Sequence, residues 1–228
     1  MAKGIFLTGT GTDIGKTYIA GLLVKTLAEA GKRPAYYKAA MSGNDRRPDG
    51  SLIPGDGAFV KTFSGIGQSL ESMCPYVYEH AWSPHLAAHF EGPQIDLEVV
   101  KAGWRSVCER SDYVTMEGSG GIICPLRWDE QQHVVLDDLV KELGLGVLII
   151  ADAGLGTINS AVLTIEHLRA RDIPIRGLIF NKYVPGDLMQ DDNAAMIEAL
   201  TGVKVVAYVK EGDTDLAIDV DFLKDLYA

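Results

Sequence analysis

The segment that most constrains the fold of this chain is the glycine-rich run GTGTDIGKT, from Gly9 to Thr17. It follows a short apolar stretch, Ile5 to Thr8, and precedes a segment with the apolar spacing of a helix. A strand, a glycine-rich turn and a helix N-terminus in this order expose backbone N–H groups and the positive end of a helix dipole, which bind phosphate oxygens. The pattern therefore predicts a phosphate-binding loop in which Lys16 reaches the β- and γ-phosphates of a nucleotide and the Thr17 hydroxyl coordinates Mg²⁺.

The glycine spacing leaves a second interpretation open. Gly9 and Gly15 are separated by five residues, whereas the usual phosphate-loop pattern has four. Gly9, Gly11 and Gly15 also loosely resemble the glycine fingerprint of dinucleotide-binding folds. However, the last interval is three residues and not two, and the second expected strand ends in Lys38, where an acidic residue for the ribose belongs. We therefore favour the phosphate loop.

Short apolar runs alternate with longer segments of helical period, which is typical of a parallel sheet with crossover helices. The runs are continuously apolar and not alternating, which indicates strands covered on both faces. The expected strands are Ile5–Thr8, Ala35–Lys38, Tyr113–Met116, Val147–Ala151, Gly177–Asn181 and Val203–Tyr208. The expected helices are Lys16–Ala30, Leu97–Glu109, Ser160–Arg171, Met189–Leu200 and a short acidic one at the C-terminus. We expect an α/β fold that forms a single domain over residues 1–228, with a long loop from Gly43 to Gly57.

Composition narrows the function classes. The net charge of −10 disfavours nucleic acid and anionic membrane surfaces as partners, and no apolar run is long enough for a membrane span. With no leader sequence at the N-terminus, a cytoplasmic location is expected. The three cysteines are odd in number and contain no C-x-x-C pair, so neither disulfides nor a zinc ribbon is expected. His85 and His89 have the spacing of two ligands on one helical face, but neither a glutamate beside His85 nor a third ligand accompanies them.

Carboxylates and a second lysine stand where strand ends meet in a parallel sheet. Glu117 follows the apolar run YVTM, Asp56 lies between two glycines and Asp152 follows VLIIA. A phosphoryl-transfer site needs such groups to hold Mg²⁺ against phosphate oxygens, although any one of them could instead be a helix cap or a solvated turn residue. Lys38 ends a strand beside the first, and a second cation there suits a site that brings several negative charges together. Ser42 could add a hydroxyl donor.

Seven segments together carry a family resemblance. GTGTDIGKT, YYKAAMSG, GDGAF, SPHLAA, EGSGG, ADAGLGTINSAVLT and GLIFNK occur in this order between Gly9 and Lys182. In this combination, above all EGSGG with DAGLGTIN, the chain resembles the dethiobiotin synthetase family. The resemblance implies a P-loop parallel sheet of about seven strands with helices on both faces, and a homodimer. It also implies formation of dethiobiotin from 7,8-diaminopelargonic acid, CO₂ and ATP, with Mg²⁺ as the metal.

The resemblance also implies a mechanism and roles for individual residues. A substrate amine captures CO₂ as a carbamate, the carbamate attacks the γ-phosphate to give a carbamic phosphoric anhydride, and the second amine displaces phosphate and closes the ureido ring. The implied catalytic residues are Lys16, Lys38 and Ser42, and the implied Mg²⁺ ligands are Thr17, Asp56 and Glu117. The implied nucleotide-binding residues are Thr12, Asp13, Ile14, Gly15, Lys16, Thr17, Tyr18, Glu117 and Asn181, of which Asn181 would read the base edge.

The implied substrate-binding residues are Thr12, Asp13, Lys38, Ser42, Gly118, Gly156, Thr157, Ile158 and Asn159. The last four lie at an expected helix N-terminus, which the resemblance places at the dimer interface beside the carboxylate of the substrate bound to the neighbouring subunit. The bland alternative is that Thr157 simply caps its own helix.

The chain departs from the family pattern in two places. Ala39 stands where a proline usually follows the strand-end lysine, and YVKEGDT replaces a proline-containing base-binding turn. Two other functions stay open on sequence alone. One is a P-loop switch ATPase of the partition-protein type. Such proteins typically carry an additional lysine early in the loop and a basic or amphipathic surface, whereas this loop has no lysine between Gly9 and Gly15 and the chain is anionic. The other is a different amide-forming P-loop enzyme.

Overall fold

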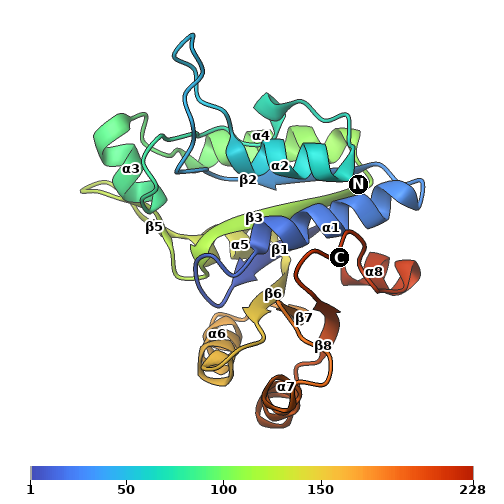
Figure 1. Cartoon of the computed structure of the whole chain (residues 1–228). Helices are drawn as coiled ribbons and strands as arrows, with labels where there is room; N and C mark the ends of the chain where they lie inside the picture. The colour runs from blue at the N-terminus through green and yellow to red at the C-terminus, as the bar shows by residue number, and fades with distance from the viewer. Residues whose placement is uncertain (1, 228) are drawn as a thin grey trace.

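The computed structural model describes residues 2–227, and its centre is a six-stranded sheet in the order β2-β3-β1-β6-β7-β8 (Figure 1). Every neighbouring pair of these strands is parallel, which confirms the predicted α/β architecture. The strands are β1 (Lys3–Gly9), β2 (Pro34–Lys38), β3 (Tyr113–Gly121), β6 (Gly146–Asp152), β7 (Ile175–Asn181) and β8 (Val205–Val209). The sheet has six strands, not the seven or so expected, and β4 (Pro125–Trp128) and β5 (His133–Val135) form a separate antiparallel pair.

Helices cover both faces of the sheet because successive strand residues point to opposite sides. In β1, Ile5 and Leu7 pack on one face and Phe6 on the other. The first face is covered by α1 (Lys16–Glu29), α2 (Gly55–Ser64) and α8 (Val220–Leu226). The second is covered by α4 (Leu97–Arg110), α5 (Leu136–Leu143), α6 (Thr157–Ala170) and α7 (Leu188–Thr201). Within residues 2–227, no helix combines the length and apolar character that crossing a bilayer requires.

Three boundaries differ from the expectation by three residues or more, each for a local reason. The strand expected to end at Met116 continues to Gly121, because the glycine-rich EGSGG segment still pairs with β1. The helix expected near Ser160 begins at Thr157, after Gly156 in the left-handed conformation (φ 91°). Part of the predicted loop from Gly43 to Gly57 is instead the first turn of α2, in which Asp56 favourably meets the helix dipole.

Several elements have no counterpart among the sequence expectations. They are α2, α3 (Pro84–Glu91), α5, the 3₁₀ turn η1 (Leu70–Ser72) and the β4–β5 hairpin. All of them lie between residues 55 and 143. The remainder of the predicted loop protrudes from the body of the protein (Figure 1), and an isolated antiparallel bridge joins Arg46 to Leu52.

The sheet order places functional segments at one edge. From β1 the chain first crosses to β2, two places away, and later to β6 on the opposite side. Ligands of open α/β sheets bind outside the carboxyl ends of strands at such a reversal. In register, Glu117 of β3 lies between Lys38 of β2 and Leu7 of β1, shortly before β1 enters the glycine-rich loop.

Candidate active site

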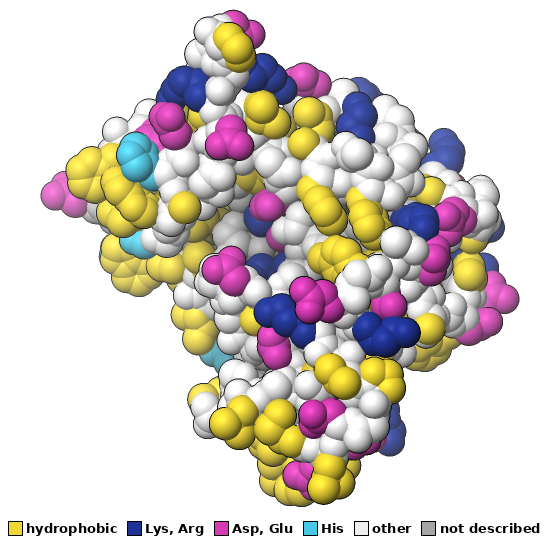
Figure 2. All heavy atoms as spheres, in the orientation of Figure 1, with side chains coloured by type: hydrophobic (Ala, Val, Ile, Leu, Met, Phe, Trp, Pro, Cys, Tyr) yellow, Lys and Arg dark blue, Asp and Glu magenta, His cyan; other side chains and the backbone are white. Residues whose placement is uncertain are grey.

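A pocket of about 570 Å³ opens beside the carboxyl ends of β1, β2 and β3. Figure 2 shows the hollow in the middle of this face, with acidic and basic side chains inside it. The residues that line it are Thr12, Asp13, Gly15, Lys16, Thr17, Lys38, Ser42, Asp56, Ala81, Trp82, Ser83, Pro84, Glu117, Ser119, Gly120 and Cys124. The structure therefore brings together nine of the residues that the sequence had singled out, from segments more than 100 residues apart.

The glycine-rich loop is held in shape by its own backbone and by β7. Gly15 precedes α1 with φ 90°, a left-handed conformation that favours glycine. A β-carbon at Gly15 would also collide with the Asn181 amide. That amide donates a hydrogen bond to the carbonyl of Ile14 (2.8 Å), and the Lys16 ammonium donates one to the carbonyl of Gly11 (2.9 Å). Gly15, Lys16 and Thr17 line the pocket at the start of α1, where the first N–H groups have no partner within the helix.

The electrostatics of Lys16 suit an anion. Burial lowers the pKa of Lys16, the Glu117 carboxylate acts in the opposite direction, and the nearby Lys38 ammonium lowers the pKa further. The side chain is buried, and its only hydrogen-bond partner within residues 2–227 is a neutral carbonyl. Negative charge entering the pocket would therefore stabilise the ammonium form.

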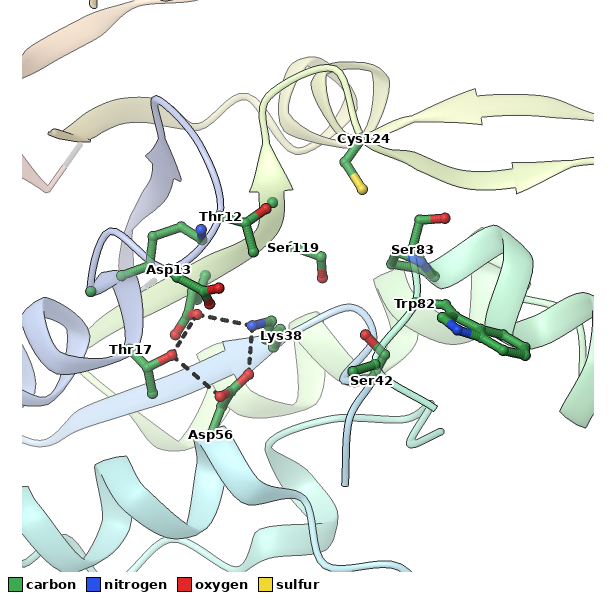
Figure 3. Close-up of a pocket in the computed structure, with 16 residues that line it drawn as sticks. Thr12, Asp13, Thr17, Lys38, Ser42, Asp56, Trp82, Ser83, Ser119 and Cys124 are labelled. Carbon is green, nitrogen blue, oxygen red and sulfur yellow. Dashed lines mark hydrogen bonds and ion pairs between the residues drawn. The ribbon is translucent and has the colours of Figure 1, made fainter. Parts of the chain in front are cut away.

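Two carboxylates, a hydroxyl and a lysine form a compact cluster on the pocket floor (Figure 3). The Thr17 Oγ1 atom lies 2.9 Å from Glu117 Oε1 and 3.3 Å from Asp56 Oδ1. The Lys38 Nζ atom lies 2.9 Å from the same Glu117 oxygen and 2.6 Å from Asp56 Oδ2. Asp56 is partly exposed, whereas Glu117 and Lys38 are buried. One ammonium thus balances two carboxylates in a largely desolvated place.

The charge of Lys38 is secured by these two partners. Burial by itself lowers the pKa of Lys38, but the Glu117 and Asp56 carboxylates outweigh it, so that the pKa rises above its usual value. A buried cation without such partners would be costly. Lys38 therefore remains an ammonium at neutral pH.

The sequence analysis missed Tyr36, a buried residue of β2 that contacts Glu117. Its hydroxyl donates a hydrogen bond to Glu117 Oε2 at 2.7 Å. Burial, followed by the nearby Glu117 charge, raises the pKa of Tyr36 well above its usual range, so the phenol stays neutral. A signal for this residue was available, because positions two apart on a strand share a face and Tyr36 stands two before Lys38.

The oxygen atoms around Thr17 fit Mg²⁺ by their chemistry. Residues 2–227 contain no group of three or more His, Cys, Asp or Glu side chains placed to hold a metal ion. Magnesium does not need one, because it is usually held by one or two carboxylates together with substrate phosphates and water. Asp56, Glu117 and the Thr17 hydroxyl supply that kind of set next to the phosphate loop.

Some predicted residues lie outside the pocket lining. Ile14 and Asn181 stand behind the loop, and Gly118 packs beneath it, where a β-carbon would meet the Phe6 ring at 2.8 Å. The Tyr18 ring turns away to contact Phe59 and Phe63. Asn181 is 4% exposed and its amide nitrogen is engaged, so a contact with a base edge stays a prediction.

Two further groups of predicted residues are also absent from the pocket. Asp152 pairs with Lys182 (3.0 Å) and accepts a hydrogen bond from the backbone N–H of Gly154. The segment Gly156–Asn159 starts α6, with Gly156 and not Thr157 at the N-cap position. Within one chain, this helix end does not reach the pocket.

Residues not predicted individually complete the pocket wall. Trp82, Ser83 and Pro84 lie at the start of α3, and Ser119, Gly120 and Cys124 lie at and after the end of β3. The segments SPHLAA and EGSGG contain most of them, so the family resemblance indicated these segments without singling out the residues. Ser119 donates a hydrogen bond to the carbonyl of Ala40 (3.0 Å), which ties β3 to the segment after β2. Burial raises the pKa of Cys124 to about 11, so its thiol is neutral.

Comparison with solved structures identifies the fold. The chloroplast FtsY of Physcomitrella patens matches with a TM-score of 0.54 at 16% identity, over 99% of this chain and 65% of that one. The MinC:MinD complex of Aquifex aeolicus matches with a TM-score of 0.53 at 14% identity, over 99% and 87%. At such identities the likeness concerns the fold alone.

Comparison of sequences identifies the family. A family model described as an AAA domain matches residues 3–214. The ATP-dependent dethiobiotin synthetase BioD of Brachyspira hyodysenteriae is 48% identical over 93% of this chain and 94% of its own length. The protein of the same name from Clostridium perfringens strain 13 is 39% identical over 99% and 98%. Since the match extends over nearly the whole of each chain, this chain belongs to the ATP-dependent dethiobiotin synthetase family.

Proposed function

We propose that the pocket joins 7,8-diaminopelargonic acid and CO₂ at the expense of ATP, giving dethiobiotin, ADP and phosphate. The observation that carries the proposal is the position of Lys38, whose ammonium lies between Asp56 and Glu117 and close to the Thr17 hydroxyl. A second cation beside a phosphate loop suits a reaction in which two anions, a nucleotide phosphate and a carbamate, must approach each other.

The chain's own residues would divide the binding tasks. The amides of residues 12–17 and the Lys16 ammonium hold the nucleotide phosphates. Thr17, Asp56 and Glu117 would hold Mg²⁺, which supplies positive charge against the phosphate oxygens when it is bound. Lys38 and Ser42 would gather the carbamate oxygens, and Thr12 and Asp13, which also line the pocket, would contact the substrate amines.

Three steps then account for all atoms. One amine attacks CO₂ and loses a proton to form the carbamate. A carbamate oxygen attacks the γ-phosphorus, the bond to the bridging oxygen of ADP breaks, and a carbamic phosphoric anhydride results. The second amine attacks the carbamoyl carbon, phosphate leaves with the bonding pair, and a further proton is released as the five-membered urea closes. Lys38 opposes the growing negative charge in the first two steps.

In this proposal, the carboxylate of the substrate binds at the N-terminus of α6 of a second subunit. The first N–H groups of a helix favour an anion, and Gly156–Asn159 present such groups outside the pocket of their own chain. Supporting this, the Thr157 hydroxyl is buried without a hydrogen-bond partner in the described part of the chain. Large apolar side chains, Leu155 and Leu163 on or beside α6 and Ile123 near it, are exposed on this face, which a second copy of the chain would cover.

The activity can be tested with the purified protein, ATP, Mg²⁺, bicarbonate and 7,8-diaminopelargonic acid. We expect one dethiobiotin and one phosphate per ADP, and phosphate release that depends on the diamine. A diamine without the carboxylate serves as a control, and we expect its KM to be at least about 10-fold higher at an unchanged ATP affinity. A rate of phosphate release that does not depend on the diamine would instead favour a switch ATPase. Equal KM values for the two diamines would remove α6 from the substrate site.

The metal role of the two carboxylates gives a second prediction. Changing Asp56 to Asn or Glu117 to Gln should raise the Mg²⁺ concentration at half-maximal activity by about 10-fold or more, because each change removes an anionic oxygen ligand. The measurement is a Mg²⁺ titration at saturating ATP and diamine. Asp152→Asn is the matched control, since Asp152 is the last residue of β6 and lies outside the pocket lining. Unchanged titrations in both pocket variants would exclude these residues as ligands.

A further inference from the structure

We propose that Tyr36 is a positioning residue of this site, whose hydroxyl orients the Glu117 carboxylate toward Thr17 and the bound metal. The inference rests on the metal role proposed for Glu117 and extends it to a residue that would not itself touch the nucleotide, the metal or the diamine. Tyr36 is fully buried and is absent from the lining of the pocket. Its effect must therefore pass through Glu117.

The two oxygens of Glu117 have separate partners. Oε2 accepts a hydrogen bond from the Tyr36 hydroxyl at 2.7 Å, while Oε1 lies 2.9 Å from both Thr17 Oγ1 and Lys38 Nζ. Within residues 2–227, Tyr36 is the only donor to Oε2. The phenol thus fixes the rotation of the carboxylate about its last bond and leaves Oε1 as the oxygen that faces the phosphate loop. Groups behind a metal ligand commonly orient it in this way.

Tyr36 is itself held firmly from the open edge of the sheet. Strand β2 is an outer strand, so one side of its backbone has no strand partner. The Gln68 side chain fills that place, since its Oε1 accepts from the Tyr36 N–H and its Nε2 donates to the Tyr36 carbonyl, both at 2.9 Å. On the other side, Tyr36 pairs in register with Thr115 of β3. Because the backbone of Tyr36 is held on both sides and its ring is rigid, the hydroxyl has a fixed position from which it can orient the Glu117 carboxylate.

Without the hydroxyl, Glu117 would have a buried oxygen with no donor. The side chain is 1% exposed, so water cannot readily replace the lost hydrogen bond. The carboxylate would then be expected to turn so that both oxygens share Lys38 and Thr17. That rotation would preserve the buried ion pair but misplace the oxygen that serves the metal. The expected defect is therefore in metal affinity, with little effect on nucleotide binding.

The adjacent residue offers a matched control. Tyr37 is also buried on β2, but it points to the opposite face of the sheet, where its hydroxyl donates to the carbonyl of Val100 at 2.7 Å. Tyr36→Phe and Tyr37→Phe each remove one buried phenol hydroxyl and keep the ring. Each should lower the melting temperature, but only Tyr36→Phe should disturb the pocket.

The test measures Mn²⁺ binding by electron paramagnetic resonance, with a non-hydrolysable ATP analogue present, on the full-length protein. We expect Tyr36→Phe to raise the Mn²⁺ Kd by about 10-fold. The Kd of the analogue without metal should stay within about twofold, and Tyr37→Phe should match the unmodified protein in both measurements. In a double-mutant cycle, Tyr36→Phe should add almost nothing to the effect of Glu117→Gln, because both changes act on one ligand.

The outcomes separate this inference from the proposed function. If Glu117→Gln weakens Mn²⁺ binding and Tyr36→Phe does not, the positioning role is wrong and the metal site stands. If Glu117→Gln has no effect on Mn²⁺ binding, the metal role of Glu117 fails first. Equal weakening in Tyr36→Phe and Tyr37→Phe would trace the effect to lost packing in β2 and would also overturn the inference.

Discussion

Replacing Lys16 with alanine is expected to lower kcat by about 10³-fold or more, because phosphoryl transfer relies almost entirely on positioning and on charge that opposes the phosphates. The nucleotide should also bind more weakly, since the loop amides alone would hold it. Steady-state turnover with ATP and the diamine, together with calorimetric titration of ATP, measures both effects. Retention of most of the activity would contradict the assignment of Gly9–Thr17 as a phosphate loop.

The same variant should not unfold the protein, and the sign of the pKa shift explains why. Burial lowers the pKa of Lys16, so the charged form is disfavoured in the folded state at any pH below that lowered value. This penalty is fully present near pH 7 and is relieved only as the pH rises toward the unfolded pKa of lysine. Removing the charge should therefore leave the melting temperature of the nucleotide-free protein unchanged or slightly higher. Lys25→Ala is a suitable control, because Lys25 belongs to the same helix but pairs with Asp215 outside the pocket.

The parts of the site that the sequence predicts are those whose signals lie within a few neighbouring residues. The loop from Gly9 to Thr17 requires a strand, glycines and a helix start within a dozen residues, and all three signals are local. Lys38 and Glu117 follow apolar runs, and a parallel sheet brings the ends of such runs together. Their proximity could therefore be expected before the structure was known.

The remaining parts depend on contacts between distant segments. Nothing local in GDGAF shows that Asp56 begins a helix, because two of the five residues are glycines and the helix is stabilised by packing against α1. The bond between Tyr36 and Glu117 spans 81 residues. The β4–β5 hairpin and α5 are short elements whose stability comes from the core that they cover. Periodicity in a single sequence carries none of this information.

Replacing Lys38 is expected to lower both the activity and the stability of the protein. Changing Lys38 to Gln should lower kcat by about 10²–10³-fold, because the carbamate and the phosphate lose the cation between them. ATP binding should stay measurable, since Lys16 and the loop amides remain. Breaking a buried ion pair should also cost about 3 kcal/mol in the free energy of unfolding, because Glu117 is left as a buried carboxylate without its ammonium. Most of this cost belongs to Glu117, since Asp56 is partly exposed to solvent.

The contrast with Lys16 follows from the opposite direction of the shift. The pKa of Lys38 is raised in the folded protein, so its contribution to stability is fully present below the unfolded pKa of lysine and is lost only as the pH rises through the folded value. Chemical denaturation near pH 7 should therefore show the whole loss for Lys38→Gln and none for Lys16→Ala. Adding Mg²⁺ with a non-hydrolysable ATP analogue should recover more stability in Lys38→Gln than in the unmodified protein, because the metal then offsets the charge of Glu117 and Asp56. A Lys38→Gln protein that is as stable as the unmodified one, and gains no more from the metal, would show that the two carboxylates do not depend on this lysine.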